Sequence, residues 1–315
     1  MSRTPLKPGR PAYRALSALA LLTLTAGALT ACDSKESSSR HAPASPSATS
    51  SAAPRGGPSA GSKPRMITHD GHRLAFYVTP GSGRTIVLDS GGGEDASYWK
   101  DLVPKLHAAT GATVITYDRA GMGKSDVVPG AWNAEGTAGD LTSGLEQLGV
   151  TGNVILVSHS EAGEVANYFA AENPKMLSGA VLVDSNLPQF FTDEEIARVV
   201  AGSRSQIDVA KRDPGKPGNR QLISTAEDYL PAHQAFHKVS WPDSVPVTVI
   251  VSEKTPFDGS PVDAQRWRDA AASFVKAGPH RTLVTAKGSS HDVPKDRPAL
   301  VLKEIEAMAG AAAPN

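Results

Sequence analysis

Between residues 65 and 315 the chain alternates short runs of apolar, β-branched residues with longer segments of mixed polarity. Eight runs have the length of strands: residues 66–69, 73–78, 85–88, 113–117, 154–157, 180–183, 245–251 and 282–284. Asp70-Gly71 between the first two runs is typical of a tight hairpin turn. Continuous apolar strands separated by stretches of helical length indicate a parallel sheet buried on both faces. We therefore predict an α/β fold whose mostly parallel eight-stranded sheet, an antiparallel hairpin followed by six parallel strands, is flanked by helices.

The spacing of the runs is interrupted once, between the sixth and the seventh. Residues 186–244 contain two segments of helical pattern, at 193–201 and 226–238. A stretch rich in Pro, Gly, Lys and Arg at 212–220 separates them, and such residues favour a break. We expect residues 186–244 to form a helical lid inserted after the sixth strand.

The N-terminal 64 residues have a different character. Basic residues precede an apolar segment at 15–29, which is too short to span a bilayer comfortably. Leu29-Thr30-Ala31-Cys32 follows, and Cys32 is the only cysteine of the chain. This arrangement resembles the lipobox of bacterial lipoproteins, which implies that residues 1–31 are a signal peptide and that Cys32 is acylated. The sequence thus predicts export and a lipid anchor at the outer face of a bacterial cell membrane.

Residues 33–64 contain no Val, Ile, Leu, Met or aromatic residue, and 24 of these 32 residues are Ser, Ala, Pro or Gly. Such a composition cannot bury enough apolar surface to order a chain, so we predict a disordered tether over residues 32–64 and a single domain over 65–315. The whole chain has 32 basic and 32 acidic side chains, and this balance gives no reason to expect nucleic acid as a partner. We also expect no cofactor, no metal and a monomer.

Residues that could take part in catalysis follow several of the predicted strands. Val157-Ser158-His159-Ser160-Glu161-Ala162-Gly163 leads from a buried strand directly into a helical pattern. Small residues two before and two after Ser160 are what a sharp strand-to-helix turn requires, because the backbone passes close to its neighbours there. Three further stretches also follow strands: Asp89-Ser90-Gly91-Gly92-Gly93, Asp118-Arg119-Ala120-Gly121-Met122-Gly123-Lys124-Ser125-Asp126 and Ser289-Ser290-His291-Asp292.

Together these four stretches resemble the α/β-hydrolase fold family over essentially all of residues 65–315. The resemblance implies that Ser160 is a nucleophile, that His291 is its general base, and that the backbone N–H groups of Gly92 and Glu161 form the oxyanion hole. Ser90 stands where the family has a histidine, which leaves Gly93 as an alternative to Gly92. The stretch from Asp118 to Asp126 is interpreted as structural.

The other histidines are not predicted to be catalytic. His159, beside the nucleophile, is interpreted as structural, and His107, His233, His237 and His280 are expected at the surface. The Glu161 side chain stands where relatives carry an uncharged residue. It either selects a cationic substrate or suits the N-terminus of a helix.

The acid that would orient His291 is the least determined part of the site. The family often places an aspartate after the seventh strand, but this chain reads Ser252-Glu253-Lys254-Thr255-Pro256, with threonine at that position. We favour Asp184, which ends the sixth strand, and keep Asp258 and Glu253 as alternatives.

The sequence therefore predicts a serine hydrolase that works by acyl transfer on a small-molecule substrate, most readily a carboxylic ester. Amide, lactone and peptide substrates stay open. A catalytically silent, ligand-binding lipoprotein of the same fold is the alternative, supported by the threonine at position 255. A remoter alternative is a dinucleotide-dependent oxidoreductase, because Gly91-x-Gly93-x-x-Ala96 follows a strand and Asp118 ends the next one.

Overall fold

The computed structural model describes residues 63–310. The predictions of a signal peptide, of acylation at Cys32 and of nearly all of the tether lie outside the described residues. Within them, the eight predicted strands are all present, as β1 Arg65–His69, β2 His72–Thr79, β3 Thr85–Asp89, β4 Thr113–Asp118, β5 Val154–His159, β6 Leu177–Val183, β7 Val247–Ser252 and β8 Arg281–Ala286.

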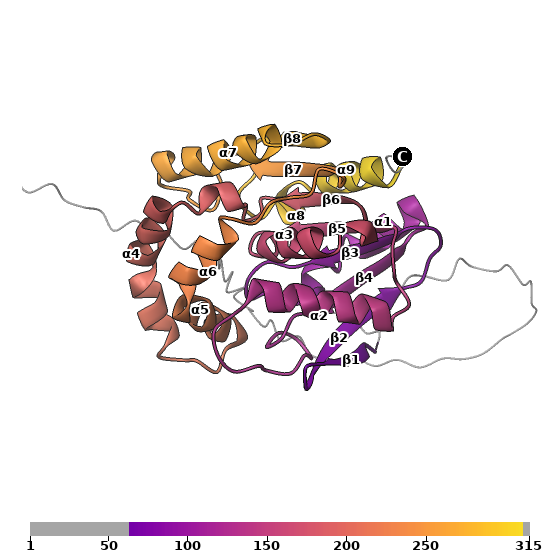
Figure 1. Cartoon of the computed structure of the whole chain (residues 1–315), viewed down its shortest axis with the longest axis horizontal. Coiled ribbons are helices and arrows are strands. Elements are labelled where there is room, and N and C mark those ends of the chain that lie inside the picture. Colours follow the sequence, from indigo (N-terminus) through magenta and orange to yellow (C-terminus); the bar gives the residue numbers. More distant parts are fainter. Residues whose placement is uncertain (1–62, 311–315) are drawn as a thin grey trace, which may run out of the picture.

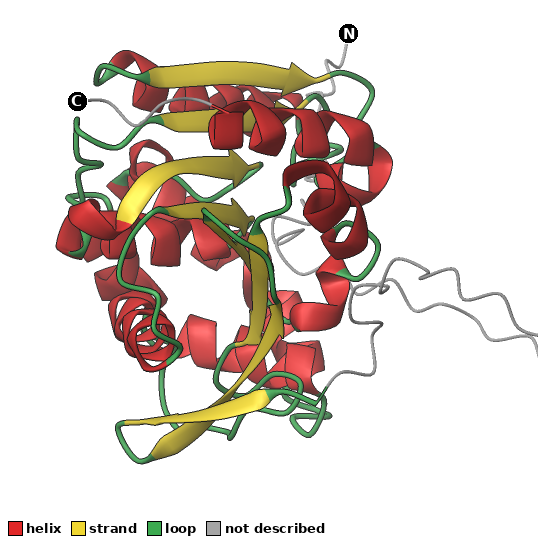
Figure 2. Cartoon of the chain, turned by 90° about the vertical axis from the view of Figure 1, so that its right-hand side faces the viewer, coloured by secondary structure: helices red, strands yellow, loops and turns green. Residues whose placement is uncertain are grey.

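These strands form one sheet in the order β1-β2-β4-β3-β5-β6-β7-β8. The pairs β1–β2 and β2–β4 are antiparallel, and every other pair is parallel. The sheet twists strongly from β1 to β8 (Figure 2). The prediction of a hairpin followed by six parallel strands is confirmed. The ends of β3, β4 and β5 lie side by side as a consequence, because these strands are neighbours that run in the same direction.

Helices cover both faces of the sheet (Figure 1). One buried cluster includes residues of α2 Ala134–Gln147, α3 Ala162–Glu172 and α7 Pro261–Lys276. The other includes residues of α1 Val103–Thr110 and α9 Pro298–Gly310. The central strand β5 has side chains in both clusters, and its first four residues, all Val, Ile or Leu, are at most 1% exposed. Short helical turns complete the layers: η2 Ala96–Trp99, η3 Pro174–Met176, η4 Pro188–Phe190 and α8 Val293–Asp296.

Three helices lie between β6 and β7, gathered at one end of the sheet on the left of Figure 1: α4 Asp193–Ala210, α5 Pro217–Glu227 and α6 Tyr229–Phe236. The break predicted between the helices is present but shorter, at 211–216, and three details of the prediction differ. The helix expected at 193–201 extends to Ala210. The segment expected as a break at 212–220 contains the start of α5, because Pro217 occupies the first helical position, where proline is well tolerated. The helix expected at 226–238 is divided at Asp228, whose backbone leaves the helical conformation between α5 and α6.

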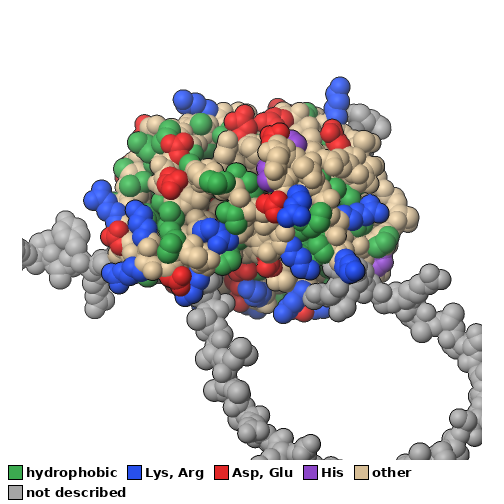
Figure 3. Space-filling model, turned by 90° about the horizontal axis from the view of Figure 1, so that it is seen from below, with side chains coloured by type: hydrophobic (Ala, Val, Ile, Leu, Met, Phe, Trp, Pro, Cys, Tyr) green, Lys and Arg blue, Asp and Glu red, His purple; other side chains and the backbone are tan. Residues whose placement is uncertain are grey.

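The surface seen from below in Figure 1 shows acidic, basic and hydrophobic side chains interspersed with one another (Figure 3). None of the helices in the described part of the chain has the length and apolar content needed to cross a membrane.

Candidate active site

Ser160 lies on the sharp turn between β5 and α3. Its φ angle is 58°, a left-handed conformation that is uncommon for a residue with a side chain and that turns the strand directly into the helix. The turn is fixed by hydrogen bonds, since Ser160 N–H donates to Val183 O at 3.2 Å and Ser160 O accepts from Asn186 N–H at 2.9 Å. Gly163 makes this approach possible, because a Cβ there would lie 2.4 Å from Asn186 O.

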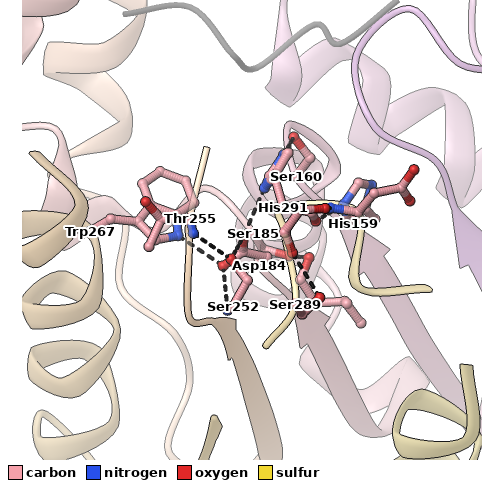
Figure 4. A network of polar contacts seen from close by, with 12 residues as sticks. His159, Ser160, Asp184, Ser185, Ser252, Thr255, Trp267, Ser289 and His291 are labelled. Atoms are coloured by element: carbon pink, nitrogen blue, oxygen red, sulfur yellow. Dashed lines mark hydrogen bonds and ion pairs between the residues drawn. The ribbon is translucent and has the colours of Figure 1, made fainter. Parts of the chain in front are cut away.

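The structure brings Ser160, His291 and Asp184 into one hydrogen-bonded chain (Figure 4). His291 Nε2 lies 2.8 Å from Ser160 Oγ, and His291 Nδ1 lies 2.7 Å from Asp184 Oδ2. These residues follow β5, β8 and β6, and all three are buried. The arrangement can accept a proton from the serine hydroxyl on one side of the imidazole while a carboxylate stabilises the resulting cation on the other.

Asp184 is held by more than its histidine partner. Ser252 donates to it through both its N–H, at 2.9 Å, and its hydroxyl, at 2.6 Å, and Trp267 Nε1–H donates at 3.0 Å. Burial alone would raise the pKa of Asp184, but the hydrogen bond and charge of His291 and the two bonds from Ser252 outweigh it and lower the pKa below its ordinary value. The carboxyl group is therefore ionised at neutral pH.

The two alternative acids lie elsewhere. Glu253 is exposed and accepts a hydrogen bond from Gly288 N–H. Asp258 is also exposed. Neither is a hydrogen-bond partner of His291. Thr255, at the position where the family often has its aspartate, is buried and bonds with backbone and serine groups: its N–H donates to Ser252 Oγ and its hydroxyl accepts from Phe257 N–H.

His159 supports the loop that carries His291. Its Nε2 lies 3.0 Å from the carbonyl oxygen of His291, so this nitrogen carries a proton and donates it to the bond. Burial, together with the charge of His291, lowers the pKa of His159 to about 4, which keeps the ring neutral. Tyr98 stacks on the ring at a centroid distance of 5.2 Å.

Two backbone donors border the nucleophile. Within residues 63–310, the N–H groups of Gly92 and Glu161 donate no hydrogen bond, although both residues are buried. A Cβ on the preceding Gly91 would lie 3.2 Å from Ser160 Cβ, so this loop runs in van der Waals contact with the nucleophile. Unused buried donors at this place are available to a negatively charged oxygen.

The Glu161 side chain is occupied inside the protein. Its carboxylate lies 3.6 Å from Arg119 Nη2 and accepts hydrogen bonds from Gln221 Nε2 at 3.0 Å and Thr225 Oγ1 at 3.2 Å. Burial raises its pKa to about 7, although the charge of Arg119 opposes this rise. Of the two interpretations of Glu161, selection of a cationic substrate is disfavoured, because its side chain is buried and its oxygens already contact Arg119, Gln221 and Thr225.

Arg119, in the loop that was interpreted as structural, is buried, with 4% of its surface exposed. The sequence did not predict the burial of Arg119. Burial alone would lower its pKa, but Asp89 and Glu161 outweigh this effect and raise the pKa, so the guanidinium is charged. His233 also differs from expectation: it is 2% exposed rather than at the surface, and its Nε2 lies 3.1 Å from Glu164 Oε1. The carboxylate of Glu164 provides the partner that a buried imidazole needs.

Helix α5 packs against the side chain of Glu161, next to the nucleophile. Ser160 is 1% exposed. Besides the bonds to Glu161, α5 is fastened by Arg220 Nη2, which donates to Gly121 O at 2.9 Å, and by Ser224 Oγ, which donates to Gly130 O at 2.7 Å. A cavity of about 440 Å³ lies beside α5 and is lined by Gln221 and Ala120 among others, but by none of Ser160, His291 and Asp184.

Sequence reasoning did not single out Ser252, Trp267 or Gln221, which contact the site from β7, α7 and α5. Their polar atoms meet the site only after folding, and no local motif marks them. In the described part of the chain, no group of His, Cys, Asp and Glu side chains is arranged to hold a metal ion.

A model of the alpha/beta hydrolase family matches residues 86–304, and the chain belongs to this family. An uncharacterised protein of Bacillus subtilis (strain 168), YqjL, is 26% identical over 224 residues, which cover 70% of this chain and 81% of that protein. A soluble epoxide hydrolase of Corynebacterium sp. (strain C12) is 32% identical over 123 residues, 38% of this chain and 42% of that enzyme. A solved structure of a thermophilic esterase from Thermogutta terrifontis shares the fold, with a TM-score of 0.55 and 22% identity over 78% of this chain and 97% of that one.

Proposed function

We propose that the protein is a serine hydrolase that acts by acyl transfer, most readily on carboxylic esters. The observation that carries this proposal is the pair of hydrogen bonds at His291, 2.8 Å to Ser160 Oγ and 2.7 Å to Asp184 Oδ2. A serine hydroxyl is a weak nucleophile unless a base is in reach of its proton, and this geometry supplies the base and the group that orients it.

The reaction begins when Ser160 Oγ attacks the carbonyl carbon of the substrate. The hydroxyl proton passes to His291 Nε2, and Asp184 stabilises the imidazolium. The carbonyl electron pair moves onto oxygen, where the N–H groups of Gly92 and Glu161 stabilise the negative charge. When this intermediate collapses, His291 returns the proton to the departing alkoxide. Water, activated by the same imidazole, then hydrolyses the acyl-enzyme and regenerates Ser160.

The similarity to a soluble epoxide hydrolase raises epoxide opening as another reaction. Epoxide hydrolases of this family use an aspartate at the nucleophile position, and this chain has Ser160 there. The catalytically silent alternative rested on the threonine at position 255. It loses that support because Asp184 contacts His291 directly. The dinucleotide-binding alternative has no support from the family to which the chain belongs.

For location, we propose that acylation at Cys32 anchors the domain at the outer face of the cell membrane. The support for this is the sequence of residues 1–64 alone, with its basic start, apolar segment and single cysteine. Globomycin, which inhibits lipoprotein signal peptidase, should cause the uncleaved precursor to accumulate, and Cys32→Ser should do the same or release the domain. A Cys32→Ser protein that is cleaved to the wild-type mature size and still retained by the membrane contradicts the anchor.

The experiment for the activity is a panel of p-nitrophenyl esters of increasing acyl length. Wild-type protein should hydrolyse at least one of them, and Ser160→Ala should reduce kcat by about 10⁴-fold or more. Ser158→Ala is the matched control, because Ser158 is equally buried and its hydroxyl has no hydrogen-bond partner in the described residues. Equal losses in the two variants, or no hydrolysis by folded wild-type protein, contradict the proposal.

A further inference from the structure

The peptide group between Gly91 and Gly92 has its two polar ends in different environments. The carbonyl oxygen of Gly91 accepts a hydrogen bond from Arg119 Nη2 at 2.6 Å and a longer one from Glu94 N–H at 3.3 Å. A trans peptide group is planar, and its C=O and N–H point in opposite directions. Fixing the Gly91 carbonyl on Arg119 therefore fixes the direction of the Gly92 N–H, the proposed oxyanion donor.

Arg119 is itself fixed from two sides. Its Nε lies 3.9 Å from Asp89 Oδ1, at the end of β3, and its Nη2 lies 3.6 Å from Glu161 Oε2, immediately after the nucleophile. Asp89 is held in turn by Tyr117, whose hydroxyl donates to Oδ2 at 2.9 Å. Arg119 follows β4, so one guanidinium joins the ends of three neighbouring parallel strands.

The oxyanion loop packs closely against the Glu161 carboxylate. A Cβ at position 92 would lie 2.8 Å from Glu161 Oε2, so a larger residue there would have to displace this carboxylate. Gln221 and Thr225 of α5 hold the same carboxylate from the other side. The carboxylate, the guanidinium and the Gly91–Gly92 peptide are therefore packed as one unit.

From this geometry we infer that Arg119 is a positioning residue for the oxyanion hole: it orients the Gly91–Gly92 peptide and ties it to Glu161, so that the two N–H donors converge on one point beside Ser160. The inference rests on the proposed acyl-transfer function. A charged donor on the carbonyl also polarises the peptide group, which strengthens the N–H at its other end. A lysine cannot replace Arg119, because its single nitrogen cannot reach Gly91, Asp89 and Glu161 together.

The test compares Arg119→Lys, which keeps the charge, with Glu164→Gln as the matched control. Glu164 lies one turn beyond Glu161, in α3. Like Arg119 it is buried and paired, but its hydrogen-bond partners are His233 and Asn186 rather than the oxyanion loop. The measurements are kcat and KM for the best p-nitrophenyl ester, affinity for a trifluoromethyl ketone and for the carboxylic acid product, and the melting temperature. The ketone adds Ser160 Oγ to its carbonyl carbon and places an oxyanion in the hole, whereas the product does not.

We expect Arg119→Lys to lower kcat and ketone affinity in parallel, by about 100-fold, while KM and product affinity stay near their wild-type values. Glu164→Gln should lower the melting temperature but keep kcat and ketone affinity close to wild type. If Arg119→Lys fails to fold, the double variant Arg119→Met/Glu161→Gln replaces it in the test, because this variant removes both charges of the pair. It should show the same loss of kcat and ketone affinity, with KM and product affinity near their wild-type values.

Two results overturn the inference and are distinguishable. If Arg119 variants lose kcat and product affinity together, or lose no more activity than Glu164→Gln, Arg119 only supports the fold and the acyl-transfer function stands. If folded wild-type protein neither hydrolyses an ester nor binds the ketone, the acyl-transfer function is wrong and the inference fails with it.

Discussion

The substitution Asp184→Asn replaces one carboxylate oxygen by an NH2 group and has a consequence that can be worked out from the hydrogen bonds. Asp184 Oδ1 accepts from Ser252 N–H and Trp267 Nε1–H, and both of these groups can only donate. The asparagine oxygen must therefore occupy the Oδ1 position. Its NH2 group then takes the place of Oδ2, facing the Ser252 hydroxyl and His291 Nδ1.

The Ser252 hydroxyl can rotate and accept a hydrogen bond, so it adapts to the amide. His291 Nδ1 can accept from an amide only if its proton moves to Nε2. The protonated Nε2 then faces Ser160 Oγ, 2.8 Å away, and can no longer take the serine proton. We expect kcat to fall by about 10⁴-fold, a loss of about 5 kcal/mol of transition-state stabilisation. The fold should persist, since the bonds from Ser252 and Trp267 are preserved or replaced.

The assay is hydrolysis of a p-nitrophenyl ester at saturating concentration, monitored by the release of p-nitrophenolate, with circular dichroism to verify folding. Asp258→Asn and Glu253→Gln serve as controls, because these exposed carboxylates are the alternatives that the sequence left open. The reasoning is refuted if Asp184→Asn retains more than about a tenth of wild-type kcat, or if either control loses as much.

Two other substitutions test the packing and charge of the site. Because the pKa of Glu161 is about 7 in the folded protein against an ordinary 4.5, the folded state holds a proton that the unfolded state releases, and stability falls as pH rises through this window. Glu161→Gln should therefore reduce the loss of unfolding free energy between pH 5 and pH 8 by about 3 kcal/mol, measured by urea titration; an unchanged loss contradicts the raised pKa. Gly163→Ala should destabilise the protein by several kcal/mol, of order 3, because its Cβ would overlap Asn186 O. Gly139→Ala in α2 is the control for this substitution, since its Cβ meets only one atom, 3.9 Å away, and should leave stability equal or higher by up to about 1 kcal/mol. Similar melting temperatures for the two alanine variants would count against the close approach of α3 to the chain after β6.

The strands and the turn at Ser160 could be predicted because their signals are local. A run such as Val154-Ile155-Leu156-Val157 is apolar wherever it lies in a fold, and the small residues around Ser160 are adjacent to it in sequence. The position of His291 after the last strand was also available from the order of elements along the chain.

The partners of these residues were harder to predict, because they are set by tertiary packing. Asp184 could be preferred over Asp258 only on position, and its contacts with Ser252 and Trp267 join residues 68 and 83 positions apart. The start of α5 at Pro217 was missed because proline and glycine signal a break as well as a helix start. The contacts of Arg119 depend on three strand ends that meet only in the folded sheet.

The most direct test of the central claim is to identify the residue that reacts with a fluorophosphonate. The reagent forms a bond between the serine oxygen and phosphorus and releases fluoride, so it marks a serine activated by a neighbouring base. Mass spectrometry of digested wild-type protein should find one adduct per chain, on Ser160, and none in His291→Ala after the same exposure. An adduct on another residue, or folded protein that never reacts, would contradict the account.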